Sequence, residues 1–225
     1  MPGILYIVAT PIGNLEDITL RALRILKEVD AIITEDTRRS RGLLSHFGIQ
    51  KKLISYFEYS KQKKAEAIVE HLTAGENLAL ITDAGTPGIS DPGARLVALA
   101  RSRGIDVVPI PGPSAMTAAL SVCGFPTDPF HFWGFLPPSN NKRRKIYAAM
   151  AGEEGTHCFY ESPHKILKRL DEWAVYFSDF TVFVGREMTK KFETILWGKF
   201  SEVAEQLRQT EARGEYTVVL SRRVI

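Results

Sequence analysis

Cysteine is scarce in this 225-residue sequence, and the usual metal-binding spacings are missing. Two cysteines are too few for a disulfide framework, and no Cys-x-x-Cys or Cys/His spacing predicts a zinc site. The five histidines are scattered without ligand spacing, so we expect no metal cofactor. Cys123 and Cys158 are expected to be buried, reduced thiols of a cytoplasmic protein.

Long apolar runs are missing as well. No stretch reaches the roughly 18 consecutive apolar residues of a membrane-spanning helix. The N-terminal apolar run, residues 4–9, lacks the basic flank and cleavage site of a signal peptide, and it is typical of a buried strand. We therefore expect no membrane partner.

Neither charge sign dominates, since 29 basic and 26 acidic residues give a formal charge of +3. With 44% hydrophobic and 24% charged residues, the composition excludes a disordered chain, a collagen-like repeat and a coiled coil. A charge of +3 alone does not indicate a nucleic-acid binder, but its uneven distribution permits contact with a phosphate backbone. Three basic clusters occur: Arg38, Arg39 and Arg41; Lys61, Lys63 and Lys64; and Lys142, Arg143, Arg144 and Lys145. The aromatic run 130–135 near the third cluster could stack on bases, but its two-residue alternation favours core packing.

The first half of the chain alternates apolar runs with helical patterns, which predicts βα units and a mostly parallel sheet. A further helix should follow the third strand, with Asp91 as its cap, Pro92 in its first turn and Gly104 at its end. The predicted strands are residues 4–9, 31–34, 78–82 and 105–110, and the other predicted helices are 17–28 and 61–73.

The second half has a different sequence pattern, and a proline-rich segment at 109–113 separates it from the first half. We predict two α/β domains, residues 1–115 and 116–225. The predicted strands of the second half are 130–135, 156–160, 181–185 and 216–221, and its predicted helices are 114–122, 142–150, 163–177 and 201–213.

The familiar nucleotide and hydrolase motifs are absent: GxGxxG, GxxxxGK[ST], GxSxG and HExxH do not occur. Instead, unusual loops follow the predicted strands of the first half. Each alone would be an ordinary turn, but the carboxyl edge of an open α/β sheet forms a ligand crevice. Four such loops predict a shared pocket whose backbone groups suit an adenosine-like ligand. They are residues 10–15, 36–40, 83–93 and 111–115.

Two dense polar segments, 159–165 and 186–193, follow strands of the second half. They are either solvated loops with salt bridges or part of a functional site. The sequence leaves both readings open.

The loop motifs and polar segments that follow the predicted strands, taken in chain order, resemble one family across residues 4–221. The chain is similar to the ribosomal RNA small-subunit (16S rRNA) cytidine-2′-O-methyltransferases of the tetrapyrrole-methylase-like superfamily. Its first loop reads TPIG and its third reads GTP, where the tetrapyrrole branches usually have a glycine-rich loop and GDP. Members of the RNA branch commonly extend several tens of residues further, in a small basic tail. The motifs that carry the resemblance are 6–15 with 17–19, 35–38, 83–87 with 91–93, 109–115, 159–164 and 186–190.

The resemblance implies a two-domain α/β fold with a mostly parallel N-terminal sheet and a mixed-sheet C-terminal domain. It implies S-adenosylmethionine (SAM) in the cleft between the domains, and a homodimer. It also implies methyl transfer to the ribose 2′-hydroxyl of a cytidine in the decoding region, with 16S rRNA or the 30S subunit as partner. The implied cofactor-binding residues are Ile12, Asp83, Gly85, Thr86, Ile89, Ser114, Ala115, Tyr160 and Thr217.

Such a reaction requires deprotonation of the ribose hydroxyl, because the hydroxyl is a poor nucleophile and must lose its proton as it attacks the methyl group. A base, or a lysine that lowers the hydroxyl's pKa, can assist this step. No metal is needed, since the sulfonium is already a good leaving group. We hypothesise that Lys190 or Glu187 serves the hydroxyl and Arg38 holds phosphate. The candidate catalytic residues are Glu35, Asp36, Arg38, Glu187 and Lys190.

Two other readings stay open. One is a methylase of the same fold that acts on a tetrapyrrole or another small molecule. The other is a noncatalytic nucleotide- or RNA-binding module, which would show no SAM binding.

Overall fold

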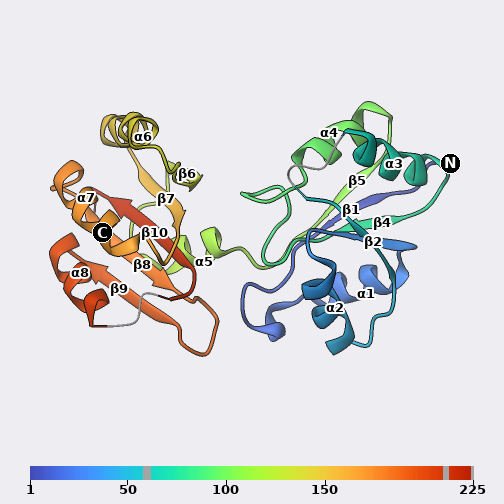
Figure 1. Cartoon of the computed structure of the whole chain (residues 1–225), viewed down its shortest axis with the longest axis horizontal. Helices are drawn as coiled ribbons and strands as arrows, with labels where there is room; N and C mark the ends of the chain where they lie inside the picture. Colours follow the sequence, from blue (N-terminus) through green and yellow to red (C-terminus); the bar gives the residue numbers. More distant parts are fainter. Residues whose placement is uncertain (58–61, 210–212, 224–225) are drawn as a thin grey trace. The chain divides into compact units, whose positions relative to one another are not determined.

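The computed structural model describes residues 1–57, 62–209 and 213–223 (Figure 1). The chain separates into two compact units, Met1–Ser114 and Ala115–Ile225. Each unit has its own five-stranded sheet and its own core.

The sheet of the first unit is entirely parallel, with strand order β3-β2-β4-β1-β5. Its central strands are continuous apolar runs, because helices cover both faces of the sheet. The strands are β1 Leu5–Val8, β2 Ala31–Thr34, β3 Lys52–Ser55, β4 Leu78–Leu80 and β5 Val107–Ile110. The helices are η1 Leu15–Asp17, α1 Leu20–Glu28, α2 Thr37–His46, α3 Gln62–Thr73 and α4 Ala94–Ser102.

The helices divide between the two faces of this sheet (Figure 1). Ile25 and Leu26 of α1 pack with Leu44 of α2 against one face, and Ile68 of α3 packs with Leu96 of α4 against the other. The adjacent strands β1 and β4 therefore send their chains to opposite faces. Such a switch point marks the ligand crevice of open α/β sheets.

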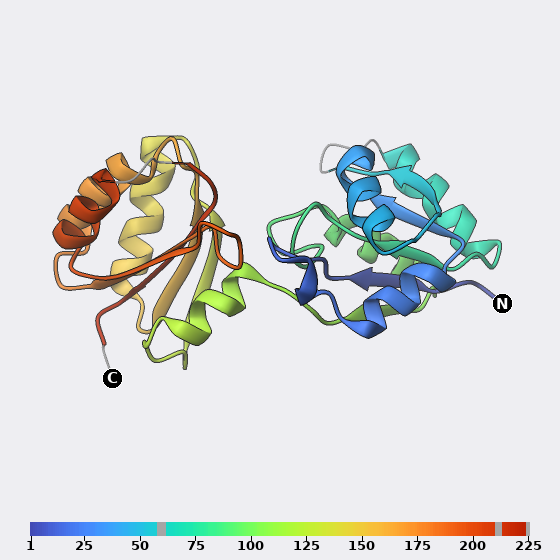
Figure 2. The same ribbon diagram turned by 90° about the horizontal axis from the view of Figure 1, so that it is seen from below.

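The second unit holds a mixed sheet of order β6-β7-β10-β8-β9, in which only β6 and β7 pair in parallel. Helices α6, α7 and α8 share one core on one face, whereas α5 packs against β10 and β7 on the other (Figure 2). The strands are β6 Phe130–Phe135, β7 Thr156–Glu161, β8 Thr181–Arg186, β9 Thr194–Gly198 and β10 Tyr216–Ser221. The helices are α5 Ala115–Val122, α6 Asn140–Gly152, α7 Ile166–Tyr176 and α8 Phe200–Arg208.

The predicted fold class and most predicted elements are confirmed, but four elements were not anticipated: η1, α2, β3 and β9. The predicted cap of α4 is wrong. The helix begins at Ala94 after Gly93, which has a φ of +148° and makes no side-chain cap, so Asp91 and Pro92 lie before it. Gly104, with a φ of +68°, does follow the helix end as predicted. Lys61 and residues 210–212, the ends of two predicted helices, lie outside the described residues.

Other side-chain predictions had mixed outcomes. Cys123 and Cys158 are free and buried, as predicted, and burial raises the pKa of Cys158 to about 12. Core packing of the aromatic run is wrong at its ends, because β6 is an edge strand and leaves Phe130 and Phe135 exposed. Arg143 is buried, so the third basic cluster does not lie wholly on the surface.

Two further properties concern the described part of the chain alone. None of its helices combines the length and the apolar character needed to cross a lipid bilayer. Within the same residues, no group of three or more His, Cys, Asp or Glu side chains is arranged to hold a metal ion.

Candidate functional site

Three loops at the carboxyl edge of the first sheet are bonded to one another. The loops after β1 and β4 meet in a two-way bridge, in which Thr10 and Gly85 each donate a backbone N–H to the other's carbonyl at 2.9 Å. The Thr86 hydroxyl donates to the carbonyl of Pro113, after β5, at 3.2 Å. The predicted loops around β1, β4 and β5 thus form one cluster at the switch point of the sheet.

The loop after β4 needs left-handed backbone at several positions. Gly85 has a φ of +80°, Gly88 of +83° and Ser90 of +62°. Gly112, after β5, lies so close to β1 that an added Cβ would stand 3.0 Å from the Cβ of Ala9. Glycine at these places lets backbones approach each other, and it leaves backbone groups near a bound molecule uncovered.

The predicted cofactor residues of this unit lie in or beside the cluster. Ile12 is buried, and its Cγ2 would stand 3.6 Å from a Cβ on Gly85. Ile89, by contrast, is exposed at the surface of the β4–α4 loop. Asp83 accepts a hydrogen bond from Arg39 Nη1 at 3.0 Å through Oδ2, whereas its Oδ1 is buried and has no hydrogen-bond partner among the described residues. A buried, unmatched carboxylate oxygen suits a ligand that carries a hydroxyl or ammonium group.

A substitution of Gly85 by alanine tests the loop. The space is adequate, but a left-handed φ costs a Cβ-bearing residue about 1–2 kcal/mol, so we expect a lower melting temperature and weaker SAM binding. Gly42, inside α2 with no heavy atom within 4 Å of an added Cβ, is the matched control. Gly42→Ala should stabilise the protein by about 0.5–1 kcal/mol. Thermal denaturation and calorimetric SAM titration of both variants measure these effects, and equal responses would contradict the role given to the loop.

In the second unit, two predicted cofactor residues lie side by side. Tyr160 and Thr217 are register partners on β7 and β10, and Phe132 and Phe135 hold the Tyr160 ring, with centroids 5.1 and 5.4 Å away. Ala115 begins α5, the helix that packs on these same two strands, and Ser114 immediately precedes it. The structure therefore brings Tyr160 and Thr217 together.

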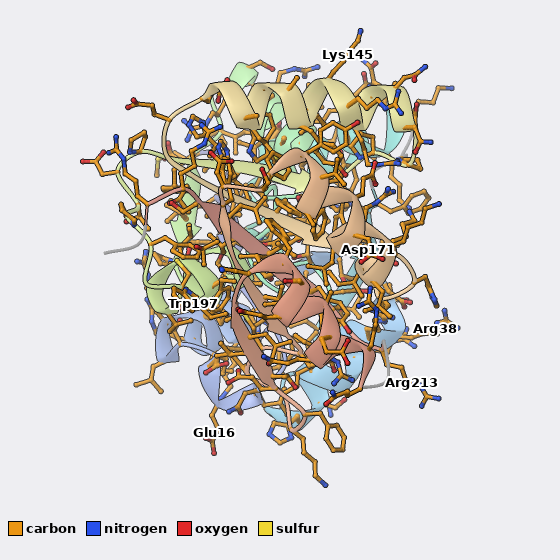
Figure 3. The ribbon with its side chains drawn as sticks, turned by 90° about the vertical axis from the view of Figure 1, so that its left-hand side faces the viewer. Glu16, Arg38, Lys145, Asp171, Trp197 and Arg213 are labelled. Atoms are coloured by element: carbon orange, nitrogen blue, oxygen red, sulfur yellow. The ribbon has the colours of Figure 1, made fainter. Side chains whose placement is uncertain are left out.

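The predicted catalytic residues of the first unit lie at the start of α2. Asp36 caps this helix: its Oδ1 accepts the Arg38 backbone N–H at 2.8 Å. This hydrogen bond, helped by the Arg38 side chain, holds the pKa of Asp36 below its ordinary value. Asp36 is thus a charged helix cap, whereas the Arg38 side chain is 89% exposed (Figure 3). Glu35 lies between β2 and Asp36.

The predicted catalytic residues of the second unit form a compact ion cluster. Lys190 Nζ donates to Glu187 Oε1 at 2.8 Å and to Glu215 Oε2 at 2.9 Å. Glu187 Oε1 also accepts the backbone N–H of Glu215 at 2.9 Å. Gly214 permits this arrangement, because an added Cβ there would stand 2.4 Å from the carboxyl carbon of Glu187.

This cluster fixes the charge of both predicted groups. Burial alone would lower the pKa of Lys190, but the hydrogen bonds from Lys190 to Glu187 and Glu215 outweigh it and the pKa is raised. Burial alone would raise the pKa of Glu187, but Lys190 and the Glu215 backbone outweigh it and the pKa is lowered. Lys190 is therefore a cation at neutral pH, suited to stabilise an oxyanion rather than to remove a proton.

The pH dependence of stability follows from these two directions. The charged Glu187 side chain raises the free energy of unfolding at pH values above its ordinary pKa of 4.5. This stabilisation is lost as the pH falls through its lowered pKa. The charged Lys190 side chain raises the free energy of unfolding at pH values below its ordinary pKa of 10.5. This stabilisation is lost as the pH rises through its raised pKa. The difference in unfolding free energy between wild type and Glu187→Gln should therefore be greatest between these pH values. Urea titrations from pH 3 to pH 11, roughly spanning that window, measure it; a difference that does not change with pH would contradict the assignment.

One group of this site was not among the residues predicted from the sequence. Glu215, the second carboxylate on Lys190, lies in a short segment before β10 that carries no motif. Glu161, in the polar segment 159–165, is a buried structural anion, since its Oε2 lies 3.4 Å from Arg169 Nε. Only the strand pairing of β7, β8 and β10 brings such residues together.

The fold and its loops define an α/β protein of two units with a ligand-binding edge on the first sheet, and comparisons with known proteins identify its class. Residues 4–219 match the family model described as Tetrapyrrole (Corrin/Porphyrin) Methylases. A solved structure titled diphthine synthase superposes with a TM-score of 0.77 at 14% identity, covering 99% of this chain and 92% of that one. A solved structure of a uroporphyrin-III C-methyltransferase from Thermus thermophilus, in complex with S-adenosyl homocysteine, superposes with a TM-score of 0.67 at 17% identity. The match covers 97% of each chain.

Relatives of higher identity share one name, ribosomal RNA small subunit methyltransferase I. The protein of that name from Halalkalibacterium halodurans is 44% identical over 97% of this chain and 75% of its own length. The one from Thermotoga maritima is 45% identical over 97% of this chain and 98% of its own length. The chain therefore belongs to the tetrapyrrole methylase family of methyltransferases and, within it, to the group that carries this name.

Proposed function

We propose that this protein transfers a methyl group from SAM to the ribose 2′-hydroxyl of a cytidine in the decoding region of 16S rRNA. The observation that carries the proposal is the identity of 44–47% over nearly the whole chain to relatives named ribosomal RNA small subunit methyltransferase I. The bonded loops at the switch point of the first sheet support it, because open α/β sheets bind their ligands at such a switch point.

The residues of the first unit suit SAM. We assign the adenosine moiety to the loops around Gly85 and Gly112, where the absence of side chains lets a ligand approach the backbone, and Ile12 supplies an apolar contact. The unmatched Oδ1 of Asp83 accepts a hydrogen bond from a hydroxyl or ammonium group of the ligand. We assign Thr86, Ile89, Ser114, Ala115, Tyr160 and Thr217 to the same ligand.

SAM supplies an activated methyl group, so the protein's task is to place the hydroxyl and ease the loss of its proton. We assign that task to Lys190, whose ammonium stabilises negative charge as it develops on the 2′-oxygen while the hydroxyl proton passes to solvent water. Glu187 holds the ammonium in position at 2.8 Å. Arg38, with its exposed guanidinium, binds a neighbouring phosphate.

The quaternary state and location complete the proposal. The family resemblance leads us to propose a homodimer that acts in the cytoplasm on the 30S subunit. Light scattering of the purified protein should give twice the monomer mass of 25.2 kDa. A monomer at micromolar concentration would contradict the dimer.

The experiment is incubation of the purified protein with methyl-labelled SAM and 30S subunits from cells that lack the modification. Label should enter the 16S rRNA, and a precorrin-like acceptor should stay unlabelled. Label in the tetrapyrrole and none in the RNA would support the alternative methylase, and failure to bind SAM would indicate a binding module.

A further inference from the structure

We propose that Phe57, Lys64 and Arg38 form a docking surface for single-stranded RNA at the carboxyl edge of β2 and β3. In this surface the Phe57 ring stacks on a nucleobase, and the two cations bind the flanking phosphates. The inference rests on the proposed function, because it places the RNA of that reaction on the first unit.

Strand pairing brings Phe57 and Arg38 to one edge of the sheet. The Tyr56 backbone N–H donates to the Thr34 carbonyl at 2.8 Å, so β3 keeps its register with β2 up to that point. Phe57 follows Tyr56, two residues beyond the end of β3, and Arg38 lies at the start of α2, two residues beyond the Glu35–Asp36 connection from β2. Since neighbouring strands are about 4.8 Å apart, the two segments leave the sheet side by side.

Phe57 has the surroundings of a stacking platform. Its side chain is 45% exposed although it is a large apolar group, and Lys64 Nζ lies 5.3 Å from its ring centroid. A nucleobase bound on this ring would therefore have an ammonium group close to its own phosphates. Aromatic rings beside cations bind single strands in this way, since every base has a face that can stack.

The N-terminal end of α2 is rich in arginine. This helix carries Arg38, Arg39 and Arg41 near its N-terminal end and no acidic residue within Thr37–His46. Cations at that end oppose the helix dipole, so they weaken the helix unless an anion is bound. Arg39 pairs with Asp83 at 3.0 Å and Arg38 pairs with the cap residue Asp36 at 3.5 Å; the Arg38 side chain is the more exposed of the two, at 89% against 71%.

The structure also selects between the basic clusters of the sequence. Arg143 of the third cluster is buried and donates to the Pro137 and Pro138 carbonyls, so it holds a loop rather than a phosphate. Lys142, Arg144 and Lys145 of that cluster are exposed, but among the described residues it is Lys64, in the first turn of α3, that lies over the Phe57 ring. The Arg39–Asp83 ion pair connects this surface to the β4–α4 loop that we assign to SAM. An RNA strand docked here thus runs beside the cofactor loop.

The test uses the full-length protein and a fluorescein-labelled single-stranded oligoribonucleotide of the decoding region. Phe57→Ala should raise its dissociation constant about 10-fold, whereas Phe57→Trp should keep it near the wild-type value. Arg38→Gln and Lys64→Gln should each lower the slope of log affinity against log salt by about 0.7. Arg101→Gln, an exposed arginine in the last turn of α4, is the matched control and should change neither quantity.

Two further readouts separate docking from folding and from the reaction itself. Melting temperature and SAM affinity of Phe57→Ala should equal those of wild type, and kcat/KM on 30S subunits should fall about 10-fold. If wild type methylates 30S subunits and Phe57→Ala binds and methylates as well as wild type, the docking surface is wrong and the proposed function stands. If wild type labels no 30S subunits, the proposed function falls and this inference with it.

Discussion

Replacement of Lys190 by methionine is expected to lower kcat for methylation of 30S subunits about 100- to 1000-fold, with SAM affinity unchanged. The reason is that the Lys190 ammonium, held by Glu187 and Glu215, is the group we assign to the developing charge on the 2′-oxygen. Steady-state kinetics and calorimetric SAM titration measure the two quantities. A kcat close to that of wild type would remove Lys190 from the mechanism.

Glu215→Gln is the matched control for this prediction. It removes one hydrogen-bonding anion from Lys190, but its side chain is 73% exposed and Glu187 remains in place. We expect kcat to change less than about 3-fold, because exposed ion pairs contribute little. Lys190→Arg should retain part of the activity since it keeps the charge. If Glu215→Gln lost as much activity as Lys190→Met, the lysine would act by holding the loop rather than on the hydroxyl.

Replacement of Arg169 by methionine is expected to destabilise the second unit by about 3–5 kcal/mol. Arg169 is 4% exposed and lies between two carboxylates, 3.4 Å from Glu161 and 2.5 Å from Glu172. The substitution leaves Glu161, itself 4% exposed, without its cation. Urea denaturation followed by tryptophan fluorescence measures the loss, because Trp133, Trp173 and Trp197 all lie in this unit.

The double substitution of Arg169 and Glu161 by methionine separates two losses of unfolding free energy: the one caused by an unpaired buried charge and the one caused by lost packing. It should recover most of the stability, because no uncompensated buried charge remains. Arg208→Met is the matched surface control, since its ion pair with Asp171 is 46% and 62% exposed and should contribute at most about 1 kcal/mol. Equal losses for Arg169→Met and Arg208→Met would contradict the buried network.

The sequence predicted those elements whose hydrophobic pattern is strong. Strand β2 is a run of four buried residues, and the buried stripe of α3 has helical spacing. It did not predict β3, whose residues are only half-buried or exposed, or the edge strand β9. It missed α2 because Thr37–His46 is polar and buries only Ser40 and Leu44. Such elements form because neighbouring strands and loops hold them, which a local pattern does not reveal.

The candidate site was predictable where loops directly follow strands. The loops after β1, β4 and β5 could be predicted as one cluster, because parallel strands place their carboxyl ends together. The bonds that join them, such as Thr86 to Pro113, could not be predicted. Nor could Glu215 or Phe57, since each owes its position to strand register rather than to a motif.

The central claim is tested most directly by mapping the methyl group. 30S subunits that lack the modification are treated with the purified protein and SAM, and the 16S rRNA is digested to nucleosides and fragments for mass spectrometry. One new 2′-O-methylcytidine is expected, within the decoding region. A methyl group on a base, on a nucleotide other than cytidine, or on no RNA at all would contradict it.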